Sequence, residues 1–161
     1  MRWNARWTPV AVAALATILV SAVGATLTDL GPWYQSLKEP SWRPPDQAFG
    51  LIWTVIFSLA ALSAIYSWRD TTSLERRRFI AIMFAANGFL NVVWSLVFFK
   101  LRRPDFSLVE VGALWLSLVV LIIATARESW RASILLVPYL IWVSIAAVLN
   151  YDVVRLNGPF G

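Results

Sequence analysis

Five uninterrupted apolar blocks constrain the fold of this chain more than any other feature of its sequence. They span residues 8–28, 48–67, 79–99, 106–126 and 132–151. Each block would rise about 30 Å as an α-helix, which is the thickness of the hydrocarbon core of a bilayer. Their single charged residue is Glu110, expected in the first turn of its helix, where the helix dipole favours a carboxylate. The sequence therefore predicts an all-α integral membrane protein with five transmembrane helices.

The connections between the blocks predict an up-down bundle that forms a single membrane domain over residues 1–161. The last three blocks are joined by "KLRRPD" and "RESWR", which are too short for anything but antiparallel neighbours. A cleaved signal peptide is the alternative for the first block, because Arg2 and Arg6 precede it. The apolar core of a signal peptide has about 7–15 residues, and this run is longer. We therefore expect an uncleaved span.

Composition excludes several classes of function. The chain is 59% hydrophobic and contains neither cysteine nor histidine, so it lacks the usual ligands of zinc, haem and iron–sulfur centres. We expect no metal site. The net charge is +5, but the basic residues form short clusters between the apolar blocks, as is typical of lipid headgroup contacts. We therefore expect a lipid bilayer rather than a nucleic acid as the surrounding partner.

Sidedness follows only weakly from the basic residues. The N-terminal side has eight of them: Arg2, Arg6, Arg69, Arg76, Arg77, Arg78, Arg127 and Arg131. The opposite side has six: Lys38, Arg43, Lys100, Arg102, Arg103 and Arg155. Since cytoplasmic loops carry the excess of Lys and Arg, the count favours a cytoplasmic N-terminus.

The longest polar connection, residues 29–47, contains the stretch "WYQSLKEPSWRPP". Its prolines cannot continue a helix and restrict the residues before them, so the segment must be irregular yet stiff. "PWYQSLK" can still form a short helix that starts at Pro32. We interpret the loop as a lid with six principal residues: Trp33, Tyr34, Pro40, Trp42, Pro44 and Pro45. The alternative is that its aromatic residues are ordinary anchors at the membrane interface.

Polar and aromatic residues recur at helical spacing inside three of the spans. The stripes consist of Asn87, Asn91 and Trp94; of Phe49, Trp53, Phe57 and Ala60; and of Trp142, Ala146, Leu149 and Asn150. Polar groups within a membrane face the bundle interior, so the stripes indicate an aromatic, weakly polar cavity without fixed charge. The alternative is that the asparagines join helices and the tryptophans fill a core.

Four segments resemble the translocator protein family, also called TspO/MBR or tryptophan-rich sensory proteins. They are "WYQSLKEPSWRPP", "GLIW", "LNVVWSLVFF" and "VPYLIWVSIAAVLNYDVVRLN", and the resemblance extends over about residues 20–157. It implies a five-helix homodimeric receptor for porphyrins in a prokaryotic cell membrane or the mitochondrial outer membrane, where relatives also bind cholesterol. The implied ligand-binding residues are Val23, Thr26, Phe49, Trp53, Asn87, Trp94, Phe106, Val109, Trp142, Ala146, Leu149 and Asn150.

A sterol-recognition element of this family maps onto Leu149, Tyr151 and Arg155. That pattern is frequent by chance, and we favour the alternative that Tyr151 and Arg155 are an anchor at the end of a helix. The chain also departs from the family's pattern. Gln47 stands where an aromatic residue is common, and Phe106 stands where tryptophan is common. Ligand preference is therefore expected to differ from that of relatives.

Two classes of function follow. The first is a binding or sensory protein for protoporphyrin-like tetrapyrroles in tetrapyrrole and oxidative-stress regulation, with porphyrin as ligand and no cofactor required. The second, implied by the resemblance, is a light-dependent porphyrin-degrading enzyme in which Trp53 and Trp142 face the macrocycle. A transporter of sterols or tetrapyrroles has less support, since the sequence shows neither internal repeats nor broken helices.

Overall fold

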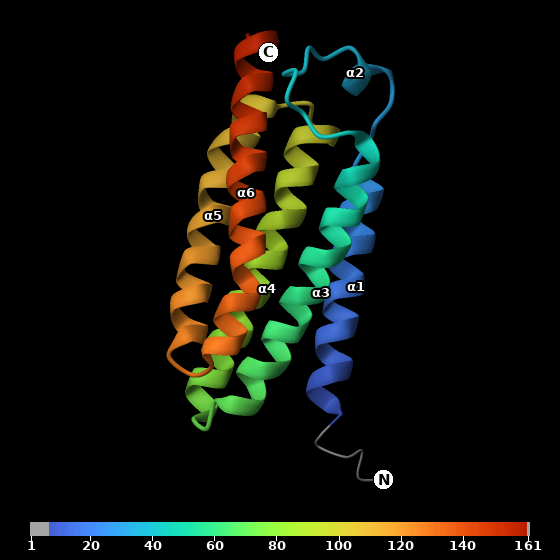
Figure 1. The fold of residues 1–161 in the computed structure, drawn as a ribbon. Coiled ribbons are helices and arrows are strands. Elements are labelled where there is room, and N and C mark those ends of the chain that lie inside the picture. The colour runs from blue at the N-terminus through green and yellow to red at the C-terminus, as the bar shows by residue number, and fades with distance from the viewer. Residues whose placement is uncertain (1–6, 161) are drawn as a thin grey trace.

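The computed structural model describes residues 7–160 and shows five long helices. They are α1 (Thr8–Leu27), α3 (Asp46–Asp70), α4 (Leu74–Ser95), α5 (Pro104–Ala126) and α6 (Trp130–Asn157) (Figure 1). A short helix α2 (Pro32–Gln35) lies in the first loop, and α4 continues into a π-helical turn η1 (Leu96–Lys100). Each of the five segments, with α4 and η1 taken together, is long and apolar enough to cross a membrane. The predicted five-helix membrane bundle is confirmed. Arg2 and Arg6, which enter the charge count, lie outside the described residues.

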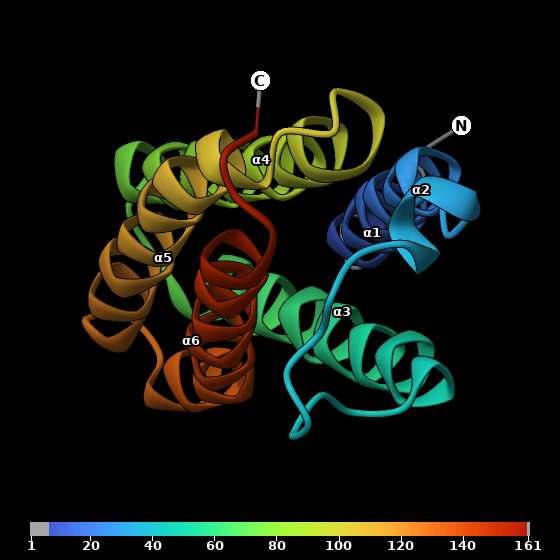
Figure 2. The same cartoon turned by 90° about the horizontal axis from the view of Figure 1, so that it is seen from above.

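The helices form a closed ring in the order α1, α3, α6, α5, α4, as the view along the bundle shows (Figure 2). The first loop and the C-terminal end of α6 lie at one end of the bundle, and the start of α1 lies at the other (Figure 1). The largest buried cluster joins α3, α5 and α6 around Ile56, Leu118 and Tyr139. The core therefore lies on the side of the ring away from α1.

Local sequence signals account for the helix ends. Ser73 and Ser129 cap α4 and α6 by accepting a hydrogen bond from a backbone N–H three residues on. Pro104 opens α5 at a position where its missing N–H costs nothing. We had expected Glu110 in the first turn of its helix. Because α5 begins at Pro104, this residue lies in the second turn instead. Both of its carboxylate oxygens are buried and have no hydrogen-bond partner among residues 7–160.

Helix α1 is the least enclosed member of the ring. None of its residues is buried, because it packs mainly against α3, α4 and η1. The two helices are close at Gly88 of α4, where a Cβ atom would lie 3.0 Å from Cγ2 of Val20. Above and below this contact the helices leave space, and a cavity lies toward each end of the bundle.

Candidate functional site

The loop-side cavity lies beneath the first loop and has a volume of about 590 Å³. Its wall is formed by residues of α1, α3, α4, η1 and α6, and its roof by residues of the first loop. No residue of α5 lines it. Pockets for small molecules in proteins have volumes of about 300–1,000 Å³, so this cavity is large enough for an organic ligand.

One wall of the loop-side cavity is an aromatic cluster contributed by α3 and α6. The Trp53 and Trp142 rings meet edge to face with their centroids 6.4 Å apart. Phe49 contacts Trp142 at 5.5 Å, and Phe57 stacks on Trp53 at 5.2 Å. These four side chains come from the predicted stripes of the second and fifth spans. They form a surface suited to the face or edge of a planar aromatic ligand.

A second aromatic wall comes from the end of α4 and from η1. Trp94 stacks on Phe98 with ring centroids 5.2 Å apart, and Phe98 contacts Phe99 at 4.8 Å. The π-helical turn shifts the side-chain direction relative to a regular α-helix. Phe98 and Phe99 are consequently both buried and both line the cavity. The sequence pattern alone did not indicate these two residues.

Two asparagines of the predicted stripes line the cavity but are already hydrogen-bonded within the protein. The side-chain oxygen of Asn150 accepts bonds from Trp94 Nε1 at 3.2 Å and Ser107 Oγ at 2.7 Å, and its Nδ2 donates to the carbonyl oxygen of Pro104 at 2.7 Å. Asn91 Nδ2 donates to the hydroxyl of Tyr139 at 3.1 Å. Asn150 therefore fixes the cavity wall rather than offering free groups to a ligand.

The Trp142 indole contributes a fully buried donor to the wall. Its side chain is 6% exposed. Its Nε1–H is buried and has no acceptor among residues 7–160. A buried donor without a partner loses its hydration without compensation. Because Nε1 has almost no accessible surface even toward the cavity, a ligand acceptor would supply the missing bond after a rotation of the indole ring.

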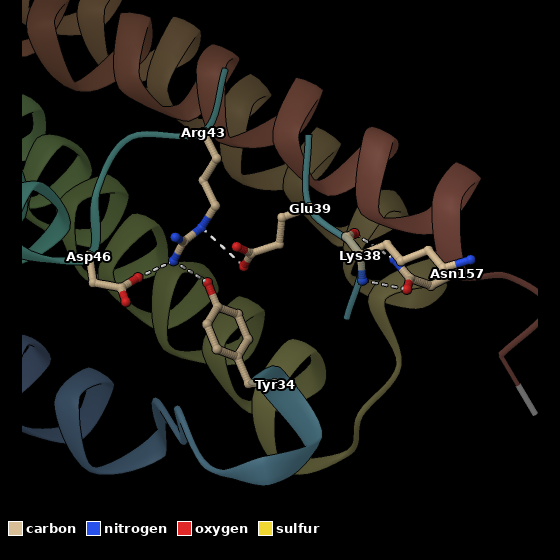
Figure 3. Close-up of polar contacts among 6 residues, drawn as sticks. All are labelled: Tyr34, Lys38, Glu39, Arg43, Asp46 and Asn157. Carbon is tan, nitrogen blue, oxygen red and sulfur yellow. Dashed lines mark hydrogen bonds and ion pairs between the residues drawn. The ribbon is translucent and has the colours of Figure 1, made fainter. Parts of the chain in front are cut away.

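The roof of the cavity is organised around Arg43 (Figure 3). Its Nε contacts Glu39 at 3.0 Å, and its Nη2 donates to the Tyr34 hydroxyl at 2.8 Å and also to Asp46. Its guanidinium also lies 5.2 Å from the centroid of the Phe49 ring. Glu39, Arg43 and Asp46 all line the cavity. The expectation of a cavity without fixed charge is therefore wrong at the roof, where the first loop supplies charges that the spans lack.

Electrostatics stabilise this arrangement. Burial raises the pKa of Tyr34, and the hydrogen bond from Arg43 offsets part of that rise. Burial would lower the pKa of Arg43, but its hydrogen bonds to Asp46 and Tyr34 outweigh burial and raise it. Near neutral pH, Tyr34 therefore stays neutral and Arg43 stays charged.

The first loop is also tied to the end of α6. Asn157 Oδ1 accepts a hydrogen bond from the backbone N–H of Lys38 at 2.7 Å, and its Nδ2 donates to the Lys38 carbonyl at 2.8 Å (Figure 3). Trp42 Nε1 donates to Asp152 Oδ2 at 3.1 Å. Because α6 continues past the predicted end at residue 151, its final turns reach the loop and hold it over the cavity.

The structure brings together seven of the twelve residues that the resemblance implied for ligand binding. Those that line the loop-side cavity are Phe49, Trp53, Trp94, Trp142, Ala146, Leu149 and Asn150. Among the predicted lid residues, Tyr34 and Pro40 line it. Trp33 packs on Phe98 beside the cavity with ring centroids 6.3 Å apart. Pro44 and Pro45 lead directly into α3, for which Pro45 is the N-cap.

The other five implied residues lie elsewhere. Val23 and Thr26 do not line the loop-side cavity, because α1 turns a different face toward it. That face carries residues at i, i+3, i+4 and i+7, namely Ser21, Gly24, Ala25 and Thr28. The run of small residues is the only sequence signal that would have indicated this face.

Asn87, Phe106 and Val109 are separated from the loop-side cavity for different reasons. Asn87 donates to Ser117 Oγ at 2.8 Å and lines a second cavity nearer the N-terminal end. Phe106 and Val109 lie on the outward face of α5 and are 57% and 77% exposed. Neither lines either of the two cavities.

The residues of the sterol-like pattern do not share one surface. Leu149 lines the loop-side cavity, whereas Tyr151, two positions further on α6, is 54% exposed. Residues two apart on a helix point in nearly opposite directions. Arg155 pairs with Asp152 at 3.1 Å. The placement of Tyr151 and Arg155 fits an anchor at the membrane interface.

Comparison with known proteins places this geometry in context. Residues 9–156 match the TspO/MBR family. A tryptophan-rich protein TspO of Chlorobaculum tepidum is 36% identical over 142 residues, covering 87% of this chain and 90% of the relative. The protein CrtK of Rhodobacter capsulatus is 32% identical, covering 91% of each chain. A translocator protein of Sus scrofa is 30% identical, covering 78% of this chain and 75% of the relative.

Proposed function

Because this chain belongs to the TspO/MBR family of membrane proteins, we propose that it binds a porphyrin or a similarly flat tetrapyrrole in the loop-side cavity. In this proposal it is a sensory binding protein, and occupancy of the cavity is reported through the position of the first loop. The relatives named as tryptophan-rich or translocator proteins are consistent with a membrane protein of this kind.

The observation that carries the proposal is the unpaired indole N–H of Trp142 within an aromatic wall. A tetrapyrrole has extended faces that pack against aromatic rings, and it carries nitrogen and carboxylate acceptors that an indole N–H can bond. A purely aliphatic ligand would fill the cavity but leave this donor unsatisfied. A free-base porphyrin also needs no axial ligand, so the absence of histidine is no obstacle.

The test is a titration of detergent-purified protein with protoporphyrin IX in the dark. We expect saturable binding. Trp142→Phe should weaken it about two- to tenfold, because a neutral hydrogen bond contributes about 0.5–1.5 kcal/mol while the phenyl ring keeps most of the packing.

Trp115→Phe is the matched control for this titration. Trp115 lies on α5, donates to Ser144 at 2.9 Å and does not line the cavity. Its replacement should leave the affinity unchanged. Binding that does not saturate, or an equal loss in both variants, would overturn the proposal.

A second candidate function is light-dependent oxidation of the bound porphyrin. The observation that favours it is the position of Trp53 and Trp142, two electron-rich indoles that line the cavity with ring centroids 6.4 Å apart. An excited porphyrin at van der Waals distance can accept one electron from an indole and pass it to dioxygen, which gives superoxide and an indole radical cation. The indole radical then recovers its electron from the porphyrin, and superoxide adds to the porphyrin radical cation, so that one dioxygen is consumed for each porphyrin oxygenated.

Bleaching of bound porphyrin under constant illumination tests this candidate. At matched occupancy, Trp53→Phe and Trp142→Phe should each lower the rate severalfold, since phenylalanine is a much poorer electron donor. Wild-type bleaching rates in both variants would leave binding as the only activity of the site.

A further inference from the structure

A second cavity, of about 690 Å³, lies toward the N-terminal end of the bundle between α1, α3 and α4. We name it the arginine-side cavity, after Arg77 at its mouth. Its wall is mostly small and apolar, with alanines from all three helices. Phe57 belongs to the linings of both cavities and separates them. We propose that the arginine-side cavity holds one acyl chain of an anionic phospholipid, whose phosphate binds Arg77.

The shape and depth of the cavity fit an acyl chain. It extends from Thr8 and Pro9 at the start of α1 to Val20, where the contact with Gly88 closes it. Helix α1, which forms one side, has no buried residue and faces the bilayer. The wall has few polar groups at its centre, so lipid is a better occupant than water, which needs several polar partners.

Arg77 is held in position to receive an anion. Its Nε donates to the carbonyl oxygen of Thr71 at 2.7 Å, and its guanidinium lies 5.5 Å from the centroid of the Trp68 ring. Its terminal nitrogens form no ion pair or hydrogen bond with residues 7–160. The nearby carboxylates are engaged elsewhere, since Glu128 pairs with Arg76 and Asp70 accepts a bond from Ser129 at 2.5 Å. A guanidinium whose two terminal nitrogens are free is suited to a phosphate.

Ser67 is a second, independent indication of a ligand. It lies near the end of α3, lines the arginine-side cavity and is 1% exposed. Its hydroxyl has no hydrogen-bond partner among residues 7–160. The ester oxygens of a phospholipid lie next to its phosphate. Ser67 and Arg77 both line this cavity, three residues from the end of α3 and three from the start of α4. One lipid molecule would therefore supply partners for both residues.

Charge complementarity selects an anionic headgroup over a zwitterionic one. The described residues at this end of the bundle include six arginines and three carboxylates: Arg69, Arg76, Arg77, Arg78, Arg127 and Arg131, against Asp70, Glu75 and Glu128. A zwitterionic headgroup would bring its own cation into this positive surface. We therefore expect phosphatidylglycerol to be retained in preference to phosphatidylcholine with identical acyl chains.

Native mass spectrometry tests the proposal. The protein is incubated in detergent with an equimolar mixture of the two lipids, and the lipid that stays bound after the detergent is removed is measured. Wild-type protein should retain phosphatidylglycerol about fivefold more than phosphatidylcholine. Arg77→Gln should abolish the preference and Arg77→Lys should restore part of it. Arg78→Gln is the matched control, because it removes the same charge one residue away from the cavity lining. It should leave the preference intact.

Ala81→Phe and Ala85→Phe distinguish a chain in the cavity from attraction at the surface. Both alanines line the cavity and are exposed within it, so a larger side chain should fill the space without disturbing the core. Each variant should lose retention of both lipids while its thermal unfolding stays close to wild type. Retention of phosphatidylglycerol in both filled variants, or equal losses in Arg77→Gln and Arg78→Gln, would overturn the proposal.

Discussion

Arg43 has the largest number of interactions in the first loop. It joins the short helix α2 to the start of α3 by contacting Tyr34, Glu39 and Asp46, and its own side chain is only 16% exposed. Bonds to charged partners are stronger than neutral ones, and partial burial protects them from screening by salt. A single residue thereby makes an otherwise irregular segment into a defined roof.

The raised pKa of Tyr34 predicts how the roof responds to pH. Because the pKa is higher in the folded state, the stability contributed by the neutral tyrosine is fully present below about pH 10 and is lost as the pH rises through the folded value. Thermal stability should therefore be unaffected by this group between about pH 6 and 9 and should decline above about pH 10.

Tyr34→Phe should weaken that alkaline decline. The variant keeps the ring that contacts Phe99 at 5.5 Å, but it has no group to ionise. It should also lose about 1 kcal/mol of stability near neutral pH, for the hydrogen bond from Arg43. The check is the thermal unfolding midpoint of both proteins from about pH 6 to 11. Identical alkaline declines would show that another group is responsible.

At the scale of elements, the length of α6 decides where the first loop rests. The helix extends to Asn157. The Asn157 side chain forms hydrogen bonds with the backbone N–H and the backbone carbonyl of Lys38. One side chain thus fixes a loop residue 119 positions away in the sequence. The loop and the C-terminal end of α6 should consequently move together when a ligand enters or leaves.

Asn157→Ala should speed ligand dissociation from the loop-side cavity. Loss of two neutral hydrogen bonds removes about 1–2 kcal/mol from the closed arrangement, so the dissociation rate should rise by about five- to thirtyfold while association changes little. Stopped-flow release of protoporphyrin IX measures both rates. Leu156→Ala in the same turn is the control, and equal effects in the two variants would indicate general loosening of α6.

At the scale of the whole molecule, the ring of helices is asymmetric. Its core lies between α3, α5 and α6, whereas α1 closes the ring with no buried residue. A helix with so little enclosure loses few buried contacts when it shifts. Both cavities border on α1. Motion of this helix is therefore the simplest route by which one cavity can influence the other.

The five-span topology makes a direct prediction about sidedness. Reporters fused after Arg69 and after Asn157 should lie on opposite sides of the membrane, because three spans separate them. The side on which the Arg69 reporter lies then decides the orientation, and the count of basic residues favours the cytoplasm for it. Two reporters on the same side would contradict the five-span fold.

The sequence by itself determined the number of spans, their antiparallel order and the aromatic stripes of α3 and α6. These are properties of local hydrophobicity and helical spacing, and tertiary contacts do not change them. The short helix after Pro32 and the stiff loop likewise follow from proline geometry. Trp53 and Trp142 meet in the structure. Each lies on the helix face that the spacing of aromatic and polar residues in its own span had already indicated.

Only the tertiary structure decided how each helix is rotated about its axis. It placed Ser21 and Gly24 of α1 at the loop-side cavity instead of Val23 and Thr26, and it turned Val109 of α5 outward. In water, an apolar stripe on a polar helix would mark the buried face. In a bilayer both the lipid-facing and the inward-facing sides are apolar, so the apolar residues of α1 and α5 carry no such mark and packing between neighbours sets the rotation.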